Sequence, residues 1–344
     1  MRQLTLALAL ALSACSSGDA RQAPAPGAEP PPEPTPPPPL AGQLDDFELP
    51  DGFRVQQHAD QLVGADALAL ATGGDVVVAA GSEGQIVRLI DADHDGVAEA
   101  TEVFADADNA LLHPHGVVFT PGAAFVANAT TLMRHALVSG QRRLEGPGGR
   151  VGRFPDFEGH EQHPVTLAAD RRHLFVAIDD VDAAAEERAS VVEVSFSGAR
   201  RRVVATGVAG VTGLAVEPGS GALWATLRGD ERDSLTRIEE GARYDGDEAR
   251  APELVLPAGS EPAGLAFPRG PWPEGYRAGA FVALRGSRSV IFVPIQNGEV
   301  GEPTTLLAGP ETVWDGPNAL LTTSDGSLFV ADERGRVLRV VAPR

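Results

Sequence analysis

A short apolar triplet recurs six times in this chain at intervals of about fifty residues, and this repeat constrains the fold more than any other feature. The copies are Val77-Val78-Ala79, Phe125-Val126-Ala127, Phe175-Val176-Ala177, Trp224-Ala225-Thr226, Phe281-Val282-Ala283 and Phe329-Val330-Ala331, spaced by 48, 50, 49, 57 and 48 residues. A second series of apolar residues precedes the triplets at Leu68, Val117, Leu167, Leu214, Leu265 and Leu320. Because both series have one period, the chain consists of repeated structural units.

Each unit is predicted to consist of several short strands. Turn signals such as Thr72-Gly73-Gly74-Asp75 separate the first two strands, and an alternating third strand follows, for example at residues 85–89. A fourth strand follows in some units, as at residues 201–205. Four strands in about fifty residues are typical of a propeller blade. The sequence therefore predicts an all-β fold, a six-bladed β-propeller over residues 44–344.

The ends of the repeat series indicate how the ring closes. The last unit runs out after its third strand, whereas residues 53–58 precede the first unit and belong to no other. We expect this N-terminal strand to become the outer strand of the last blade, because it would otherwise leave a sheet edge bare.

The first 43 residues have the composition of an export signal and a tether. Arg2 precedes a short apolar run that ends at Leu12-Ser13-Ala14-Cys15, which resembles a bacterial lipobox. This predicts a signal peptide over residues 1–14 and a lipid on Cys15; the run is too short for a membrane span, which needs about 20 residues. The Pro-rich residues 15–43 are expected to form an extended linker. We expect the protein to lie on the periplasmic side of a bacterial envelope, at the outer membrane, and to be attached to it through the lipid alone.

The charged residues exclude several functions. The chain has 28 basic residues, all of them arginine, against 48 acidic ones, so its net charge is 28 − 48 = −20. Such a chain repels nucleic acids. The absence of lysine excludes Schiff-base chemistry and a P-loop, and one cysteine excludes an internal disulfide. We expect a monomer.

Polar residues precede the first strand of each unit. In a propeller these strands line the central channel, so the loops before them meet at one end of it. The loops carry Asp66, His113, His115, His163, Thr212, Glu261 and Asn318. Polar groups that converge on a funnel are the default candidates for a binding site. One alternative is a hydrolase whose metal is held by Asp66, Glu261 and Asn318.

Six passages of the sequence are similar to the glucose/sorbosone dehydrogenase family, the soluble sugar dehydrogenases that use pyrroloquinoline quinone (PQQ). They are Leu49-Pro50-Asp51-Gly52-Phe53, Asp91-Ala92-Asp93-His94-Asp95-Gly96, Pro114-His115-Gly116-Val117, Gly213-Leu214-Ala215, Gly264-Leu265-Ala266-Phe267 and Gly279-Ala280-Phe281-Val282-Ala283-Leu284. The resemblance spans nearly all of residues 44–342. It implies a six-bladed propeller and oxidation of a sugar or polyol, with electrons passed to a periplasmic acceptor.

The resemblance also implies roles for individual residues. The family's general base corresponds to His163, and the Asp that supports it corresponds to Asp180. A histidine suits this role because its pKa lies near neutral pH. PQQ carries three carboxylates, which arginines bind well. The cofactor-binding residues expected here are His115, Arg228, Arg285, Arg288 and Asn318.

One departure from the family favours a second function. Where the family commonly has Gly-Leu-Arg-Asn, this chain has Gly207-Val208-Ala209-Gly210. The alternative is a non-catalytic propeller that binds a sugar, a peptide or a partner in the cell envelope, since a fold does not fix a function.

A further motif predicts a calcium ion. Asp91, Asp93 and Asp95 alternate before Gly96, and Glu102 stands at the twelfth position. Oxygen ligands in this pattern suit Ca²⁺. The alternative is an acidic turn without a metal. Because the motif lies away from the loops that lead into the channel strands, we expect the ion to be structural.

Overall fold

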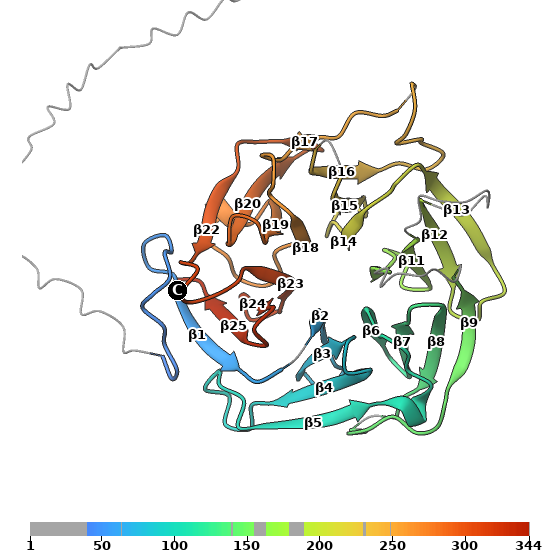
Figure 1. The fold of residues 1–344 in the computed structure, drawn as a ribbon, viewed down its shortest axis with the longest axis horizontal. Helices are drawn as coiled ribbons and strands as arrows, with labels where there is room; N and C mark the ends of the chain where they lie inside the picture. The colour runs from blue at the N-terminus through green and yellow to red at the C-terminus, as the bar shows by residue number, and fades with distance from the viewer. Residues whose placement is uncertain are drawn as a thin grey trace, which may run out of the picture. The chain divides into compact units, whose positions relative to one another are not determined.

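Short antiparallel strands account for nearly all the regular structure, as the repeat predicts. The computed structural model describes residues 40–62, 64–138, 140–154, 163–178, 189–229, 232–247 and 249–343. Residues 39–344 cluster into one unit, and within it six sheets are arranged as a ring about a central axis (Figure 1). The predicted fold class, an all-β six-bladed propeller with four-stranded blades, is confirmed.

The blades follow the chain in order. Blade 1 consists of β2 (Ala65–Leu70), β3 (Val76–Ala80), β4 (Gln85–Ile90) and β5 (Ala100–Ala105), and blade 2 of β6 (Gly116–Thr120), β7 (Ala123–Ala127), β8 (Thr131–Ala136) and β9 (Gly149–Arg153). Blade 3 consists of β10 (Val165–Leu167), β11 (His173–Ile178), β12 (Ser190–Ser195) and β13 (Arg201–Thr206), and blade 4 of β14 (Val211–Val216), β15 (Leu223–Leu227), β16 (Ser234–Ile238) and β17 (Leu254–Val255). Blade 5 consists of β18 (Pro262–Ala266), β19 (Gly279–Leu284), β20 (Ser289–Gln296), β21 (Glu299–Val300) and β22 (Thr304–Ala308), and blade 6 of β23 (Pro317–Thr322), β24 (Ser327–Asp332), β25 (Val337–Val341) and β1 (Arg54–Ala59). Two 3₁₀ turns, η1 (Ala107–Asn109) and η2 (Glu274–Tyr276), lie in connections.

The ring closes through its N-terminal strand. β1 pairs antiparallel with β25, with Val55 opposite Val340. The carboxyl end of the described chain therefore lies beside β1 (Figure 1). This confirms the predicted closure, which covers the open edge of β25.

The core is divided among the blade interfaces. Six clusters of buried apolar residues each lie between two neighbouring blades. On β3, Val77 packs toward blade 2 and Val78 toward blade 6, because successive side chains point to opposite faces. Apart from Thr226, the recurring triplet is thus apolar at every position because each blade is buried on both faces.

The channel strands are shifted by β-bulges. Where β2, β14 and β23 pair with the next strand, Asp66, Thr212 and Asn318 are extra residues in the ladder. A bulge re-aims the side chain of the extra residue. Three of the seven polar residues predicted at this end of the channel are therefore bulge residues in the first halves of their strands.

The predicted signal peptide, Cys15 and most of the predicted linker lie outside the described residues, which begin at residue 40. In the part of the chain that the structure describes, no helix is long and apolar enough to cross a membrane.

Candidate functional site at the channel mouth

We call the end of the channel where the inner strands begin the upper mouth. Just inside it lies a cavity of about 100 Å³ to which all six inner strands or the residues beside them contribute. Its polar side chains come from Asp66, His115 and Thr212; the remaining lining residues are mostly Gly, Ala, Val and Leu. Thr212 Oγ1 lies 3.1 Å from Thr226 Oγ1, so it is held by the neighbouring strand. The channel therefore presents one acid and one imidazole to a ligand.

Asp66 and His115 form the acid–base pair of the cavity. Asp66 Oδ2 lies 3.7 Å from His115 Nδ1 and accepts a hydrogen bond from the Gly81 amide at 3.0 Å. His115 is 8% exposed, and neither ring nitrogen has a hydrogen-bond partner among the described residues. Nearby, His113 Nδ1 lies 3.2 Å from the Gly81 carbonyl. His115 thus lines the cavity, and both of its ring nitrogens are buried without a hydrogen-bond partner among the described residues.

Asn318 joins two blades at the mouth. Its Nδ2 donates to the Ala65 carbonyl at 2.9 Å, which links β23 of blade 6 to β2 of blade 1. The Asn318 amide thus holds together the beginnings of two channel strands, β23 and β2. Its predicted contact with a cofactor remains a prediction.

His163 is enclosed by protein. It has no exposed surface, and its ring packs on Phe154 at a centroid distance of 4.4 Å. Nδ1 lies 3.2 Å from the Ala177 carbonyl and Nε2 lies 3.0 Å from the Ala129 carbonyl. Burial lowers the pKa of His163 to about 4, although both carbonyls favour the charged form. A base must reach its substrate, so the catalytic role stays a prediction. Asp180, its predicted partner, lies outside the described residues.

The predicted cofactor arginines meet carboxylates instead. Arg285 Nε donates to Glu261 Oε2 at 3.2 Å, and Arg228 Nη2 lies 3.9 Å from the same oxygen. Arg285 also pairs with Glu333. Arg228, Arg285 and Glu333 come from the loops after the second strands of blades 4, 5 and 6, and Glu261 directly precedes the first strand of blade 5; all of these loops lie on the upper face.

Glu261 is held in place by the backbone around it. Its own φ is 47°, a left-handed conformation that non-glycine residues seldom adopt. Its amide donates to the buried carboxylate of Asp233 at 2.8 Å. The strain is therefore offset by a charge-assisted hydrogen bond, and the Glu261 side chain lies between Arg228 and Arg285.

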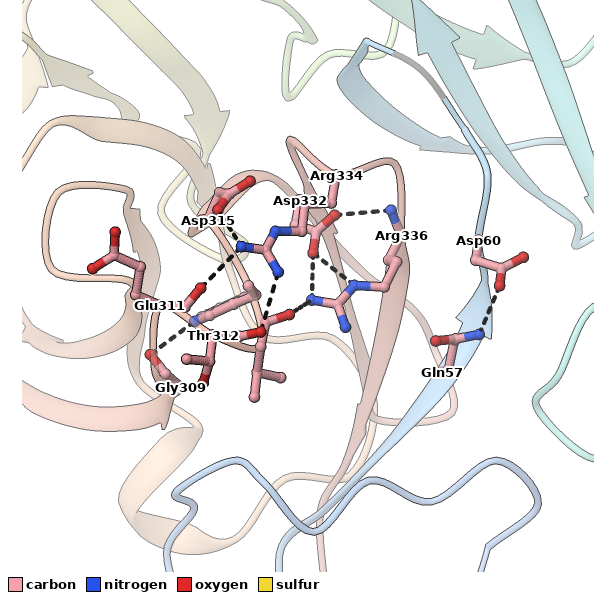
Figure 2. Close-up of polar contacts among 11 residues, drawn as sticks. Gln57, Asp60, Gly309, Glu311, Thr312, Asp315, Asp332, Arg334 and Arg336 are labelled. Carbon is pink, nitrogen blue, oxygen red and sulfur yellow. Dashed lines mark hydrogen bonds and ion pairs between the residues drawn. The ribbon is translucent and has the colours of Figure 1, made fainter.

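The loop that leads into blade 6 is braced by two more arginines (Figure 2). Arg334 donates to the Glu311 carbonyl at 2.9 Å and to Asp315 at 2.7 Å, which lowers the pKa of Asp315. Arg336 donates to the fully buried Asp332 at 2.9 Å and to the Val313 carbonyl at 2.5 Å. Both guanidinium groups are thus used to hold residues 309–316.

The donor set at the mouth does not fit PQQ. Arg228, Arg285, Arg288, Arg334 and Arg336 lie against Glu261, Glu333, Glu311, Asp315 and Asp332. Five positive charges are therefore matched by five negative ones. A cofactor with three carboxylates would have to displace these partners. The acids that pair with Arg228, Arg285 and Arg288 are exposed, whereas Asp332 is buried and would be costly to leave unpaired.

The predicted calcium motif folds into a loop between β4 and β5. Ligand oxygens of Asp91, Asp93, Asp95 and Glu99 lie within 4.8 Å of one another. Glu102 does not join them: its carboxylate binds Arg142, with Arg142 Nε at 3.0 Å from Oε2. Glu99, at the ninth position of the motif, therefore takes the place predicted for Glu102 at the twelfth. The reason is that strand β5 begins at Ala100, so Glu102 lies along this strand and away from the loop.

The acidic loop also touches the ring closure. Gln56 Nε2 donates to the Asp95 carbonyl at 3.2 Å, and His58 Nδ1 lies 2.8 Å from the Gly96 carbonyl. Gly96 has a φ of 95°, and a Cβ there would lie 2.4 Å from Gln56 Nε2. An ion in this loop would thus stabilise the contact between blade 1 and β1.

Comparisons with known proteins agree with this architecture. No protein-family model matches the chain, and no curated protein matches it either. Among solved structures, the PQQ-bound aldose sugar dehydrogenase from Streptomyces coelicolor has a TM-score of 0.67 at 16% identity, covering 85% of this chain and 99% of that one. The soluble aldose sugar dehydrogenase from Escherichia coli, in its apo-form, has a TM-score of 0.69 at 16% identity, with coverages of 85% and 100%.

A calcium structure of the Carbohydrate-Active Enzymes Family AA12 protein from Trichoderma reesei has a TM-score of 0.70 at 13% identity, with coverages of 86% and 97%. The chain therefore has the fold of the soluble sugar dehydrogenases. At these identities the likeness establishes the fold, and the functional residues have to be judged from this structure.

Two sets of functional residues were missed by sequence reasoning. The first is the acid partners Glu311 and Glu333, which follow no motif. The second is Asp332. Its position could have been noticed in the sequence, because it directly follows the triplet Phe329-Val330-Ala331. Asn128 stands at the same place after its triplet and likewise braces a loop, accepting from the Leu112 amide at 3.3 Å.

Proposed function

We propose that the protein binds a neutral sugar or polyol at the upper mouth of its channel, without PQQ. The observation that carries this proposal is the balance of charge there: Arg228 and Arg285 share Glu261, and further pairs surround them. Paired guanidinium and carboxylate groups offer many hydrogen bonds with little net charge. Such a set suits the hydroxyl groups of a neutral ligand better than a trianion.

The comparisons support the class of ligand. The solved structures that share this fold include aldose sugar dehydrogenases from two bacteria. The small cavity below the mouth, with Asp66, His115 and Thr212, could receive one polar end of such a ligand. A funnel with a few converging polar groups is the usual form of a small-molecule site.

Oxidation of the bound sugar is a second candidate function, favoured by the Asp66–His115 pair. An imidazole nitrogen without a hydrogen-bond partner can accept the proton of a hydroxyl group, and the adjacent carboxylate would stabilise the imidazolium that forms. An oxidation also needs a group that accepts two electrons. Because the mouth does not fit PQQ, the acceptor would have to be another group, such as a redox carrier of the periplasm.

Titration of the full-length chain tests both candidates. Calorimetry with aldoses and polyols should give binding at or below about 10 mM, and Glu261→Gln should weaken it at least about tenfold, because two arginines lose their partner. Glu299→Gln, an exposed change on β21 of blade 5 away from the mouth, is the control. Absence of binding by any sugar or polyol would refute the proposal.

PQQ is tested in the same preparation. Addition of PQQ with calcium should give no binding at micromolar concentration and no sugar-dependent reduction of a dye. Tight PQQ binding that Arg285→Ala abolishes would show instead that the cofactor displaces Glu261 and Glu333. Dye reduction that His115→Gln abolishes, without added PQQ, would establish the second candidate.

We further propose that the chain is exported and held in the envelope through a lipid on Cys15. The support is the sequence of residues 1–15 alone. Labelling of cells with radioactive palmitate should mark the protein, and Cys15→Ala should remove the label and release the protein from the membrane fraction.

A further inference from the structure

A groove lies between blades 2 and 3, away from the channel mouth. Its volume is about 620 Å³, and it is lined by β8, by residues 145–151 and by Phe196 and Ser197. Phe196 directly follows β12, at the end opposite the upper mouth, because β12 descends from the upper face. The groove is thus a second concave site on the lower half of the propeller.

The groove has an excess of positive charge. Arg134 and Arg150 line it, both exposed, and neither pairs with a carboxylate of a described residue. Glu145 is the one acidic residue among those that line it. Of the five arginines in residues 134–153, Arg142 and Arg143 pair with Glu102 and Asp106, which leaves Arg134 and Arg150 to face the groove in a chain whose net charge is −20. A local excess of cations on so acidic a protein favours an anionic ligand.

The walls have the features that bind sugar rings. Phe196 is half-buried, rests on Phe125 at a centroid distance of 4.7 Å and turns toward the groove. Ser197 adds a hydroxyl, and Gly148 and Gly149 leave the backbone uncovered beside Arg150. An aromatic ring packs against the apolar face of a sugar, and a guanidinium group binds a carboxylate through two hydrogen bonds.

We propose that this groove binds an acidic saccharide, a short chain of sugars that bear carboxylates. Arg134 and Arg150 bind the carboxylates, and Phe196 packs against a ring between them. The concave shape distinguishes this ligand from a membrane, because the flat surface of a bilayer would meet the rim and leave Phe196 without contact. The site goes beyond the sugar binding proposed for the upper mouth and does not depend on it.

Calorimetry of the full-length chain with linear trigalacturonate tests the proposal. Arg134→Gln and Arg150→Gln should each weaken binding about tenfold, and the double variant about a hundredfold. Affinity should also fall as salt is added. Arg153→Gln is the matched control, because Arg153 is exposed on the same strand, β9, but does not line the groove. The affinity of this variant for trigalacturonate should stay within about twofold of the wild-type value. Thermal unfolding checks that each variant folds.

Three outcomes would overturn the proposal. The first is unchanged affinity in the double variant. The second is equal binding of maltotriose, which has no carboxylates. The third is failure of trigalacturonate to bind; if vesicles rich in phosphatidylglycerol bind instead and Arg134→Gln releases them, the cations belong to a membrane site. Glu261→Gln, at the upper mouth, should leave trigalacturonate binding unchanged, so the two sites can be judged separately.

Discussion

The buried imidazole of His163 should make the stability of the fold depend on pH. Its pKa is about 4 in the folded protein and about 6.5 in the unfolded chain, because burial opposes the charge. Above pH 6.5 the ring is neutral in both states, so the contribution is fully present. As pH falls from about 6.5 toward 4, the unfolded chain takes up a proton first and stability is lost.

The size of the effect follows from the two pKa values. The loss is about 2 kcal/mol at pH 5 and approaches about 3 kcal/mol below pH 4. Urea unfolding at pH 8 and pH 5, followed by the fluorescence of the buried Trp224, Trp272 and Trp314, gives the free energy of unfolding in each condition.

The variant His163→Gln isolates this contribution. A glutamine amide can donate to both the Ala129 and the Ala177 carbonyls but does not titrate, so the loss between pH 8 and pH 5 should shrink by about 2 kcal/mol. His58 and His135, whose pKa values burial also lowers, affect wild type and variant alike and cancel. An equal loss in both proteins would refute the reasoning. It would show that the two carbonyls offset the cost of burying the charge.

Three further predictions concern the ring and the acidic loop. Asp332→Ala should lower the free energy of unfolding by about 3–5 kcal/mol, because Arg336 is left unpaired in a buried site; replacing both residues by apolar ones should recover much of it in urea unfolding. Calcium should raise the melting temperature of the wild type, and chelation should reverse this, whereas Asp93→Asn should respond less; equal melting curves with and without calcium would contradict the metal site. Val55→Asp places a charge in the buried closing strand and should open the ring to limited proteolysis, while Val255→Asp, on an outer strand and 51% exposed, should not.

Prediction from the sequence was most successful where the physics is local and repeated. Strands buried on both faces need unbroken apolar triplets, so Phe125-Val126-Ala127 and its five counterparts are visible without coordinates. The closing strand was predictable for the same reason, since Val55 belonged to no repeat and the last unit lacked a strand. The bulged positions Asp66 and Asn318 were also found, because their place relative to the triplets is fixed by the blade.

The site was predicted less completely because its chemistry depends on contacts between blades. Arg228 and Arg285 follow the second strands of their blades as expected, yet what they contact is set by Glu261 and Glu333 from neighbouring blades. Sequence spacing cannot show that two arginines from different blades share one carboxylate. Glu102 illustrates the same limit: the twelfth position suits a calcium loop between helices, but here a strand begins first.

The sequence by itself determined the number of blades, the order of their strands and the strand that closes the ring. These depend on hydrophobic period and on the need to cover sheet edges, both of which can be read along one chain. Only the tertiary structure decided that the arginines at the mouth are neutralised, that both nitrogens of His163 face carbonyls, and that Arg134 and Arg150 meet over one groove. Charge balance and burial depend on residues that are far apart in the chain. The energy of an ion pair depends on the distance between its two charges in space, and only the folded structure sets that distance.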